Sequence, residues 1–343
     1  MRKTIPERYS RQILFKEIGE SGQYALLNSR VLLVGCGALG CAQAEMLARA
    51  GIGYLRIVDR DFVEHSNLQR QTLFTESDSD LRLPKAVAAK RRINAINSEI
   101  NVEDIVADVN LSNVEELVKD CDLVIDGTDN FQVRYLVNDA CVKNNVTWIY
   151  GAAVSSYGST MTIIPGETPC LRCIFDEMPD AGSAPTCDTS GVIMPIIQTV
   201  AAAQAAEALK LLVGNKDAIH HSLMQFDIWS NERQRIKLGA PDSDCICCGQ
   251  RKFEFLDADA AEFAAVLCGR DAVQLGAAAG TRLDLDALAK RLGPALNVIQ
   301  NEYLLRFKID SNDVTVFADG RAIIKGVDSI AAARSIYARY IGT

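Results

Sequence analysis

The sequence predicts an α/β protein with a doubly wound parallel sheet and a small C-terminal α+β domain. The first observation is a β-prone apolar run, residues 30–34, that leads directly into the glycine-rich segment GCGALG at 35–40. The second is an alanine-rich helical pattern at 38–50, followed by another β-prone run at 54–58. A strand, a tight glycine turn, a helix and a strand in this order begin a Rossmann-like sheet.

The remaining elements follow from apolar runs and turn signals. In the main part of the chain we expect helices after Pro84 and near 193–213, and strands at 122–126, 147–154, 160–164 and 223–228. Residues 177–191 are rich in Pro, Gly and Ser, which predicts a long, mobile loop. Towards the C-terminus we expect strands at 303–309, 314–318 and 322–325, a hairpin turn at Asp319-Gly320 and a helix at 329–340.

The composition is that of an ordinary globular protein, with 48% apolar and 23% charged residues over 343 positions. This length allows one large core and a smaller appendage, so we expect two domains, at 1–250 and 251–343. The net charge of −8 argues against nucleic acid as a partner, because that would require a basic face. Polar residues interrupt the longest apolar stretch, 192–213, and the N-terminus has no apolar run. We therefore expect a cytoplasmic protein without a membrane span.

The glycine-rich segment predicts a site for nucleotide phosphates. Gly35 allows a tight turn, Gly37 lets a phosphate approach the backbone, and Gly40 lets the helix and strand pack closely. Asp59 follows Gly40 by 19 residues, where an acid that binds ribose is expected. This fingerprint alone most often indicates a nicotinamide or flavin enzyme. A zinc-containing NAD-dependent oxidoreductase is therefore one alternative.

Cationic residues after the glycine-rich segment favour ATP instead. Arg70 lies in the segment SNLQRQ at 66–71, which follows the pair Asp59 and Asp61, and Lys85 comes next. Attack on an α-phosphate needs positioned cations and a metal that hold three phosphates and neutralise the departing pyrophosphate. Asp129 follows the strand expected at 122–126, and an exposed carboxylate at such a strand end is suited to Mg²⁺. The order and spacing of Arg70, Lys85 and Asp129 behind the glycine-rich segment together predict attack on the α-phosphate of ATP.

Five segments carry a more specific resemblance: RYSRQ at 8–12, GCGALG at 35–40, VDRDFVEHSNLQRQ at 58–71, PKA at 84–86 and TDN at 128–130. In this register, from about Glu7 to Gly249, the chain resembles the ThiF/MoeB family. Members of this family are relatives of ubiquitin-activating enzymes, and they adenylate a small ubiquitin-like sulfur carrier. One departure is Ala38, where relatives often have Gly, but backbone amides serve at that position.

The resemblance implies the adenylation fold of ubiquitin-activating enzymes and a role for each matching residue. Asp59 would bind the ribose, while Arg70 and Lys85 would contact the phosphates together with Asn67. Asp129 would hold Mg²⁺, and Arg11 would reach the nucleotide of the other subunit in a homodimer. The implied nucleotide site consists of Gly35, Gly37, Ala38, Gly40, Asp59, Asp61, Asn67, Arg70, Lys85, Asp129 and Asn130.

The resemblance also implies the acceptor, a carrier protein of the thiamine pathway or, as second choice, of the molybdopterin pathway. Adenylation would prepare its C-terminal carboxylate for thiocarboxylate formation. Within this family, a ribosomal peptide is an alternative acceptor. A non-catalytic subunit, like the inactive halves of some heterodimeric ubiquitin-activating enzymes, is an alternative from another functional class. The joint presence of Arg70, Lys85 and Asp129 counts against the non-catalytic subunit.

Cysteine spacing predicts a metal site. The chain has eleven cysteines, and four of them form the pairs Cys170-Leu-Arg-Cys173 and Cys245-Ile-Cys-Cys248. Four thiolates give a closed tetrahedral zinc site with a structural role. The alternative is four unrelated buried cysteines, and the adjacent Cys247 makes the choice of ligands less distinct.

Cys187 is a candidate for sulfur chemistry. It lies in the expected loop, in the segment TCDTSG at 186–191, which resembles a segment that some family members use for sulfur transfer or a covalent partner adduct. A persulfide from a donor protein is a further candidate source of sulfur. The neighbouring Asp188 would raise the pKa of the Cys187 thiol, which favours the alternative that this cysteine is a bystander.

Overall fold

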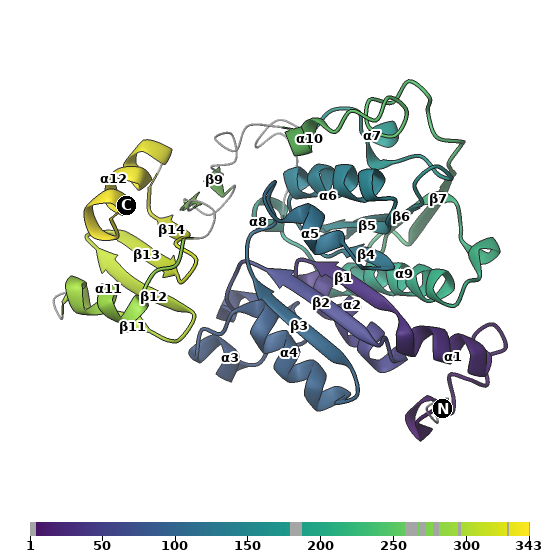
Figure 1. The fold of residues 1–343 in the computed structure, drawn as a ribbon, viewed down its shortest axis with the longest axis horizontal. Coiled ribbons are helices and arrows are strands. Elements are labelled where there is room, and N and C mark those ends of the chain that lie inside the picture. Colours follow the sequence, from purple (N-terminus) through teal and green to yellow (C-terminus); the bar gives the residue numbers. More distant parts are fainter. Residues whose placement is uncertain are drawn as a thin grey trace. The chain divides into compact units, whose positions relative to one another are not determined.

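The computed structural model describes residues 5–178, 187–257, 266–267, 272–276, 281–293, 296–327 and 329–342 (Figure 1). The chain divides into two compact units. The larger one comprises Met1–Pro179 and Ser190–Asp257, and the smaller one contains the C-terminal segment Ala258–Thr343.

The larger unit is built on an eight-stranded sheet with the order β3-β2-β1-β4-β5-β6-β7-β8. The strands from β3 to β5 run parallel, and each later pair is antiparallel. The chain winds from β1 to β2 and β3 on one side and continues with β4 on the other, which confirms the doubly wound sheet. The strands are β1 (Arg30–Val34), β2 (Tyr54–Asp59), β3 (Asn101–Val106), β4 (Leu123–Asp126), β5 (Thr147–Val154), β6 (Tyr157–Ile163), β7 (Ser222–Asp227) and β8 (Glu232–Lys237).

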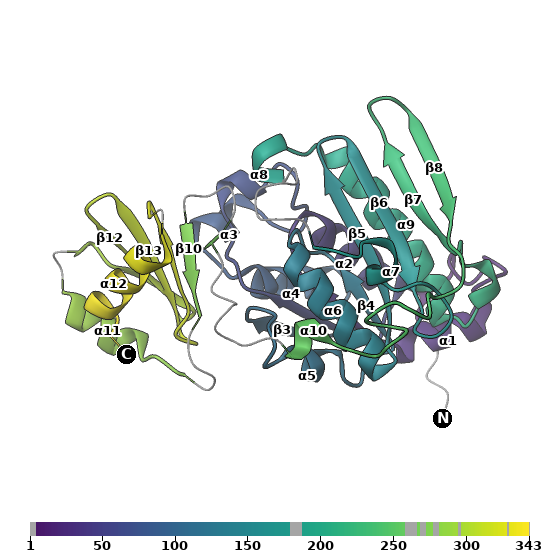
Figure 2. The ribbon, with the colours of Figure 1, turned by 90° about the horizontal axis from the view of Figure 1, so that it is seen from above.

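Helices cover both faces of this sheet (Figure 2). On one face α2 packs between α4 and α9, and on the other α6 packs against α5, α7 and α10. Each face has its own apolar core, one around Ile197 and Val200 and the other around Tyr135 and Trp148. The helices of the larger unit are α1 (Gly19–Asn28), α2 (Ala38–Ala50), α3 (Glu76–Asp80), α4 (Lys85–Ile96), α5 (Val114–Val118), α6 (Phe131–Asn144), α7 (Leu171–Ile174), α9 (Met194–Leu212) and α10 (Glu254–Asp257), with 3-10 turns η1 (Glu7–Tyr9), η2 (His65–Asn67) and η3 (Lys216–Ala218). The short helix α8 (Cys187–Ser190) lies mostly in Asp180–Thr189, which groups with the smaller unit.

The described residues of the C-terminal segment form an antiparallel sheet with the helices α11 and α12 and a core of its own, as expected for an α+β domain. Its strand order is β11-β12-β13-β14-β10-β9. The hairpin expected at Asp319-Gly320 joins β13 to β14, and Gly320 has a φ of 84° that favours glycine. The elements are β9 (Val266–Leu267), β10 (Ala272–Leu275), α11 (Leu285–Leu292), β11 (Ile299–Gln300), β12 (Leu304–Ile309), β13 (Asn312–Phe317), β14 (Ala322–Lys325) and α12 (Ile330–Tyr340).

The structure corrects the prediction for residues 177–191. Part of the expected loop is helical, because Cys187–Ser190 form α8, and residues 179–186 lie outside the described residues. The sequence interpretation also missed β3, β8 and α6. Within the described ranges, every helix is too short or too polar to cross a membrane.

Candidate active site

The glycine-rich turn between β1 and α2 is a close backbone crossing. Gly35 has a φ of 84°, which places it in the left-handed region. A Cβ on Gly40 would lie only 2.1 Å from the carbonyl oxygen of Gly35. Because backbone atoms cannot be shifted cheaply, side chains at these positions would force the loop out of its path.

A third glycine, Gly127, takes part in the same crossing from the end of β4. A Cβ on Gly127 would lie 2.4 Å from the carbonyl oxygen of Gly35 and 2.9 Å from the Cα of Gly40. The loops that follow the neighbouring strands β1 and β4 therefore touch through their backbones. The sequence interpretation missed this role, because only the pairing of β1 with β4 brings Gly127 to the turn.

The N-terminus of α2 has room for a ligand. Gly37 is its N-cap residue and Ala38 is its first residue. The position of a Cβ on Gly37 is 3.9 Å from the carbonyl oxygen of Gly127 and 4.0 Å from Nε2 of Gln71, so neither atom crowds it. The free amides of a helix N-terminus and its positive dipole end attract anions such as phosphate.

Asp59, at the end of β2, ties the turn to the neighbouring strand. Its Oδ2 accepts a hydrogen bond from the amide of Cys36 at 2.6 Å, and its Oδ1 accepts one from the amide of Asp61 at 2.7 Å. Burial raises the pKa of the Asp59 carboxyl, although Lys85 opposes this effect. Each carboxylate oxygen has two lone pairs, so these bonds leave capacity for ribose hydroxyls.

Lys85 is held beside this carboxylate by Asp61. Its Nζ lies 3.0 Å from Oδ2 of Asp61, and its backbone amide donates to the carbonyl of Asp61 at 2.9 Å. Lys85 is only 5% exposed, so it is fixed as the first residue of α4 instead of extending into solvent. Its charge acts on Cys36 in the glycine-rich turn, where it lowers the pKa of that thiol against larger effects that raise it.

Arg60 adds a cation that the sequence interpretation missed. Its Nη1 lies 3.2 Å from Oδ1 of Asp108, which follows β3. Burial alone would lower the pKa of the Arg60 guanidinium, but Asp108, Asp61 and Asp129 act against burial and the pKa is raised. Arg60 therefore stays charged between acids from the ends of three strands.

A buried ion pair shapes the loop that carries Asp129. Arg134 donates from Nε to Oδ2 of Asp126 at 2.8 Å and from Nη2 to the carbonyls of Thr128 and Gly151 at 2.6 and 2.9 Å. Asp126 also accepts from the amide and the hydroxyl of Thr128 through Oδ1. Asp129 is the next residue and is exposed.

Asn130 and Asn67 use their side-chain oxygens within the protein. Oδ1 of Asn130 accepts from the amides of Gln132 and Val133 and so caps α6. Oδ1 of the buried Asn67 accepts from the amide of Glu64 at 3.0 Å. Only their amide nitrogens are therefore suited to face a phosphate.

The two arginines predicted to bind phosphate are placed differently. Arg70 is half-buried, and its Nη1 donates to the carbonyl of Ser66 at 2.9 Å within its own turn. Arg11 is exposed on the segment between η1 and α1. Within the described part of the chain, Arg11 makes no hydrogen bond or ion pair with the residues of the glycine-rich turn.

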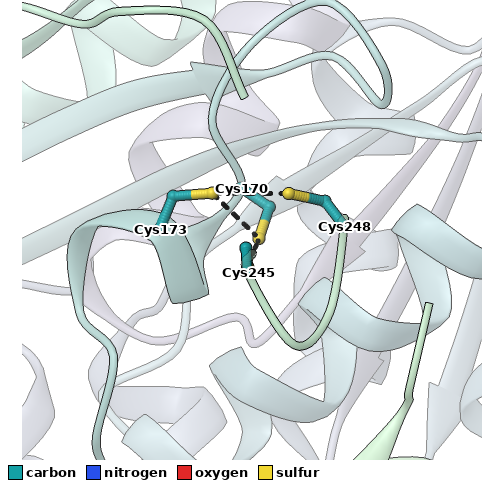
Figure 3. Close-up of side chains that lie close together, drawn as sticks. All are labelled: Cys170, Cys173, Cys245 and Cys248. Carbon is teal, nitrogen blue, oxygen red and sulfur yellow. Dashed lines mark hydrogen bonds between the residues drawn. The ribbon is translucent and has the colours of Figure 1, made fainter. Parts of the chain in front are cut away.

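The four predicted zinc ligands form one cluster, shown in Figure 3. All four Sγ atoms lie within 4.8 Å of one another. Among the described residues, these four cysteines form a group that could hold a metal ion. Cys170 and Cys245 are 3.6 Å apart, Cys170 and Cys173 are 3.9 Å apart, and Cys173 and Cys248 are 3.3 Å apart. Zn–S bonds of about 2.3 Å in a tetrahedron place sulfurs about 3.8 Å apart. The cluster therefore fits a zinc ion.

Cys247 does not belong to the four. Its Sγ accepts a hydrogen bond from Nδ2 of Asn138 at 3.2 Å, and Oδ1 of Asn138 accepts from the amide of Leu171. Burial and the nearby Cys173 raise the pKa of Cys248 to about 12. Four thiols so close together need a cation before they can ionise.

Comparison with known proteins decides the family. A family model described as "ThiF family" matches residues 9–247, more than half of the chain. The chain belongs to the ThiF family. It is 47% identical over 337 residues to the sulfur carrier protein ThiS adenylyltransferase of Bacillus subtilis (strain 168), covering 98% of this chain and 99% of that relative.

More distant members agree. The chain is 40% identical over 244 residues to the SAMP-activating enzyme E1 of Haloferax volcanii, covering 71% of this chain and 89% of that protein. A crystal structure of E. coli MccB with ATP matches with a TM-score of 0.61 and 26% identity, covering 71% of this chain and 75% of that one. The family, fold class and enzyme class expected from the sequence are thus confirmed.

Proposed function

We propose that this protein uses ATP to adenylate the C-terminal carboxylate of a small ubiquitin-like sulfur-carrier protein. The observation that carries the proposal is the open N-terminus of α2 at Gly37, with Asp59 bound to the adjacent amide of Cys36 and Lys85 fixed nearby. A relative that is 47% identical over almost the full length of both chains is named an adenylyltransferase of the sulfur carrier ThiS, which favours a thiamine-pathway carrier. A molybdopterin-pathway carrier is the second choice.

The reaction is a displacement at the α-phosphate. An oxygen of the carrier's terminal carboxylate bonds to the α-phosphorus, the bond to the β-phosphate oxygen breaks, and pyrophosphate leaves. A terminal carboxyl group has a pKa of about 3.3–3.7, so it is ionised at pH 7 and no general base is needed. Catalysis therefore rests on orientation and on neutralising charge.

The chain's own residues supply both effects. The amides at the start of α2 bind the phosphates, and Asp59 orients the ribose. Asp61 holds the ammonium group of Lys85 at 3.0 Å, and this cation and the guanidinium of Arg70 would neutralise charge on the phosphates. Arg134 and Asp126 fix the loop that presents Asp129. Asp129, exposed at the end of the β4 loop, would hold Mg²⁺, which supplies charge neutralisation for the triphosphate.

A homodimer would complete the site through Arg11 of the partner subunit. The segment before α1 that carries Arg11 also exposes Leu14 and Phe15, at 72% and 58%. The buried Tyr9 and the hydrogen bonds of Gln12 to Gln23 and Ala50 anchor this segment. Two adjacent exposed apolar side chains on an anchored segment are suited to a subunit interface.

The adenylate then accepts sulfur. The terminal sulfur of a donor protein's persulfide attacks the activated carbonyl carbon, the bond to AMP breaks, and an acyl disulfide forms. A thiolate then attacks the donor's own sulfur, which releases the thiocarboxylate and leaves a disulfide. Cys187, the first residue of α8, is the cysteine of this chain that we assign to sulfur transfer. The four-cysteine cluster would hold zinc in a closed and structural role.

One experiment tests the proposal directly. The enzyme is incubated with Mg-ATP, labelled pyrophosphate and a ThiS-like carrier, and exchange of label into ATP is measured. We expect exchange that depends on the carrier and on its free C-terminus, and we expect Asp129→Asn to lose nearly all of it while remaining folded. Asp217→Asn, an exposed acid in η3, is the matched control. Absence of exchange with ThiS-like and MoaD-like carriers, combined with tight NADH binding, would support an oxidoreductase instead.

The two candidate acceptors, a carrier protein and a peptide, can be told apart by their masses. Solved structures at 25% identity include E. coli MccB with MccA-N7isoASN. Adenylation of the C-terminus of a ribosomal peptide is the alternative to a carrier protein. Mass spectrometry after incubation with Mg-ATP identifies the acceptor, because the adenylated carrier or peptide gains the mass of an AMP group.

A further inference from the structure

Gln71 occupies a fixed position beside the glycine-rich turn. It lies just after η2, where its amide donates to the carbonyl of Asn67 at 3.0 Å and its carbonyl accepts from the amide of Phe74 at 3.2 Å. The residue is only 4% exposed. Its backbone is therefore held by the turn, and its side chain is confined to the protein interior.

The side chain of Gln71 points at the N-terminus of α2. Its Nε2 lies 4.0 Å from the position of a Cβ on Gly37, the N-cap residue of this 13-residue helix. Its Oε1 is buried and has no hydrogen-bond partner among the residues that the structure describes. A buried amide group without its hydrogen bonds destabilises the fold, so native proteins rarely retain one without a reason.

The direction of the carboxamide supplies the reason. An ionised phosphate has only acceptors, so Nε2 is the end of the carboxamide that can bind one. Presenting this donor at Gly37 leaves Oε1 directed into the protein without a partner. A stability cost that persists beside an anion site indicates a group arranged for a ligand.

We propose that Gln71 is a further phosphate-positioning residue, whose Nε2 donates a hydrogen bond to a triphosphate oxygen of ATP at Gly37. This inference rests on the proposed use of ATP. Lys85 with Asp61 supplies charge to the site, whereas the neutral carboxamide supplies a directed donor without adding a cation. Such a contact fixes the orientation of one phosphate relative to the amides of α2.

The experiment compares ligands with and without phosphates. Binding of ATP and of adenosine is measured by calorimetry, adenosine by competition, for the wild type, Gln71→Met and Gln71→Glu. Gln69→Met is the matched control, because Gln69 is exposed in the same segment. The melting temperature of each nucleotide-free protein is recorded as the second measurement.

The expected result is specific to the phosphates. A hydrogen bond to a charged group contributes enough that Gln71→Met should weaken ATP binding by about tenfold or more, with adenosine binding unchanged. Gln71→Glu, which places a carboxylate at the phosphates, should weaken ATP binding further and again spare adenosine. Nucleotide-free Gln71→Met should melt at the wild-type temperature or above it, because the substitution removes a buried polar group without its bond.

Two results would overturn the inference. One is unchanged ATP affinity in both variants. The other is equal losses for ATP and adenosine, which would indicate a packing role if the melting temperature of Gln71→Met also falls. If Gln71→Met does not fold, packing is again indicated unless Gln71→Glu folds and shows the phosphate-specific loss. Failure of carrier-dependent exchange in the wild type would refute the proposed function alone, since the ATP and adenosine comparison needs no carrier.

Discussion

Substitution of Arg134 by Met tests how the β4 loop is held. The side chains of Arg134 and Asp126 are 5% and 3% exposed, so the carboxylate of Asp126 would remain buried without its cation. Removing one partner of such a pair costs about 3–5 kcal/mol. At about 2–4 °C per kcal/mol for a unit of this size, the melting temperature should fall by about 6–20 °C.

The assay is a double-mutant cycle of thermal unfolding without nucleotide. Asp126→Asn and the double variant complete the cycle, and Arg233→Met, an exposed arginine on β8, is the control, expected to change stability by no more than about 0.5 kcal/mol. The double variant should lose less than the sum of the single variants, since it leaves no unpaired charge. A shift of Arg134→Met no larger than that of Arg233→Met, or strictly additive losses, would refute the assigned role of the pair.

Two further predictions concern the cysteines. We expect one zinc per chain by elemental analysis, and Cys170→Ser should lose the metal and melt earlier because the metal closes a chain segment of 71 residues, whereas Cys121→Ser should keep it. Metal-free wild-type protein of unchanged melting temperature would contradict this. We also expect Cys187→Ala to keep carrier-dependent pyrophosphate exchange and to slow thiocarboxylate formation, both measured on one preparation. Thiocarboxylate at the wild-type rate would show that Cys187 is a bystander, and collapse of exchange would assign α8 to the nucleotide site.

The sequence predicted those elements whose apolar pattern matches one buried environment. The strands β1 and β2 are central and lie next to a glycine turn, so their short apolar runs were distinctive. In contrast, β8 has the sequence ERQRIK and is exposed at every position, so it carries no apolar alternation. Helix α6 is buried on most sides, and its apolar residues therefore do not define one face.

The candidate site shows the same limit. Motif spacing was enough to select the four cysteines and the residues of the glycine-rich turn. The positions of Gly127, Arg60 and Gln71 depend on which strands are neighbours and on where a turn directs a side chain. The spacing of residues in the sequence reveals neither which strands are neighbours nor where a side chain points. The contact of Cys247 with Asn138 shows that Cys248, and not Cys247, is the fourth residue of the cysteine cluster.

Helix α6 connects two regions that the sequence treats as unrelated. Arg134 holds the loop of Asp129, and Asn138, four residues or about 6 Å further along the axis, binds both Cys247 and the amide of Leu171, which are the chain neighbours of two residues of the cysteine cluster. The segments that carry the four cysteines are thus bonded to the middle of the same helix whose first turn positions the loop of Asp129. If the cluster holds zinc as proposed, loss of the metal should weaken the support of α6 near Asn138, and the loop of Asp129 would lose part of its support with it.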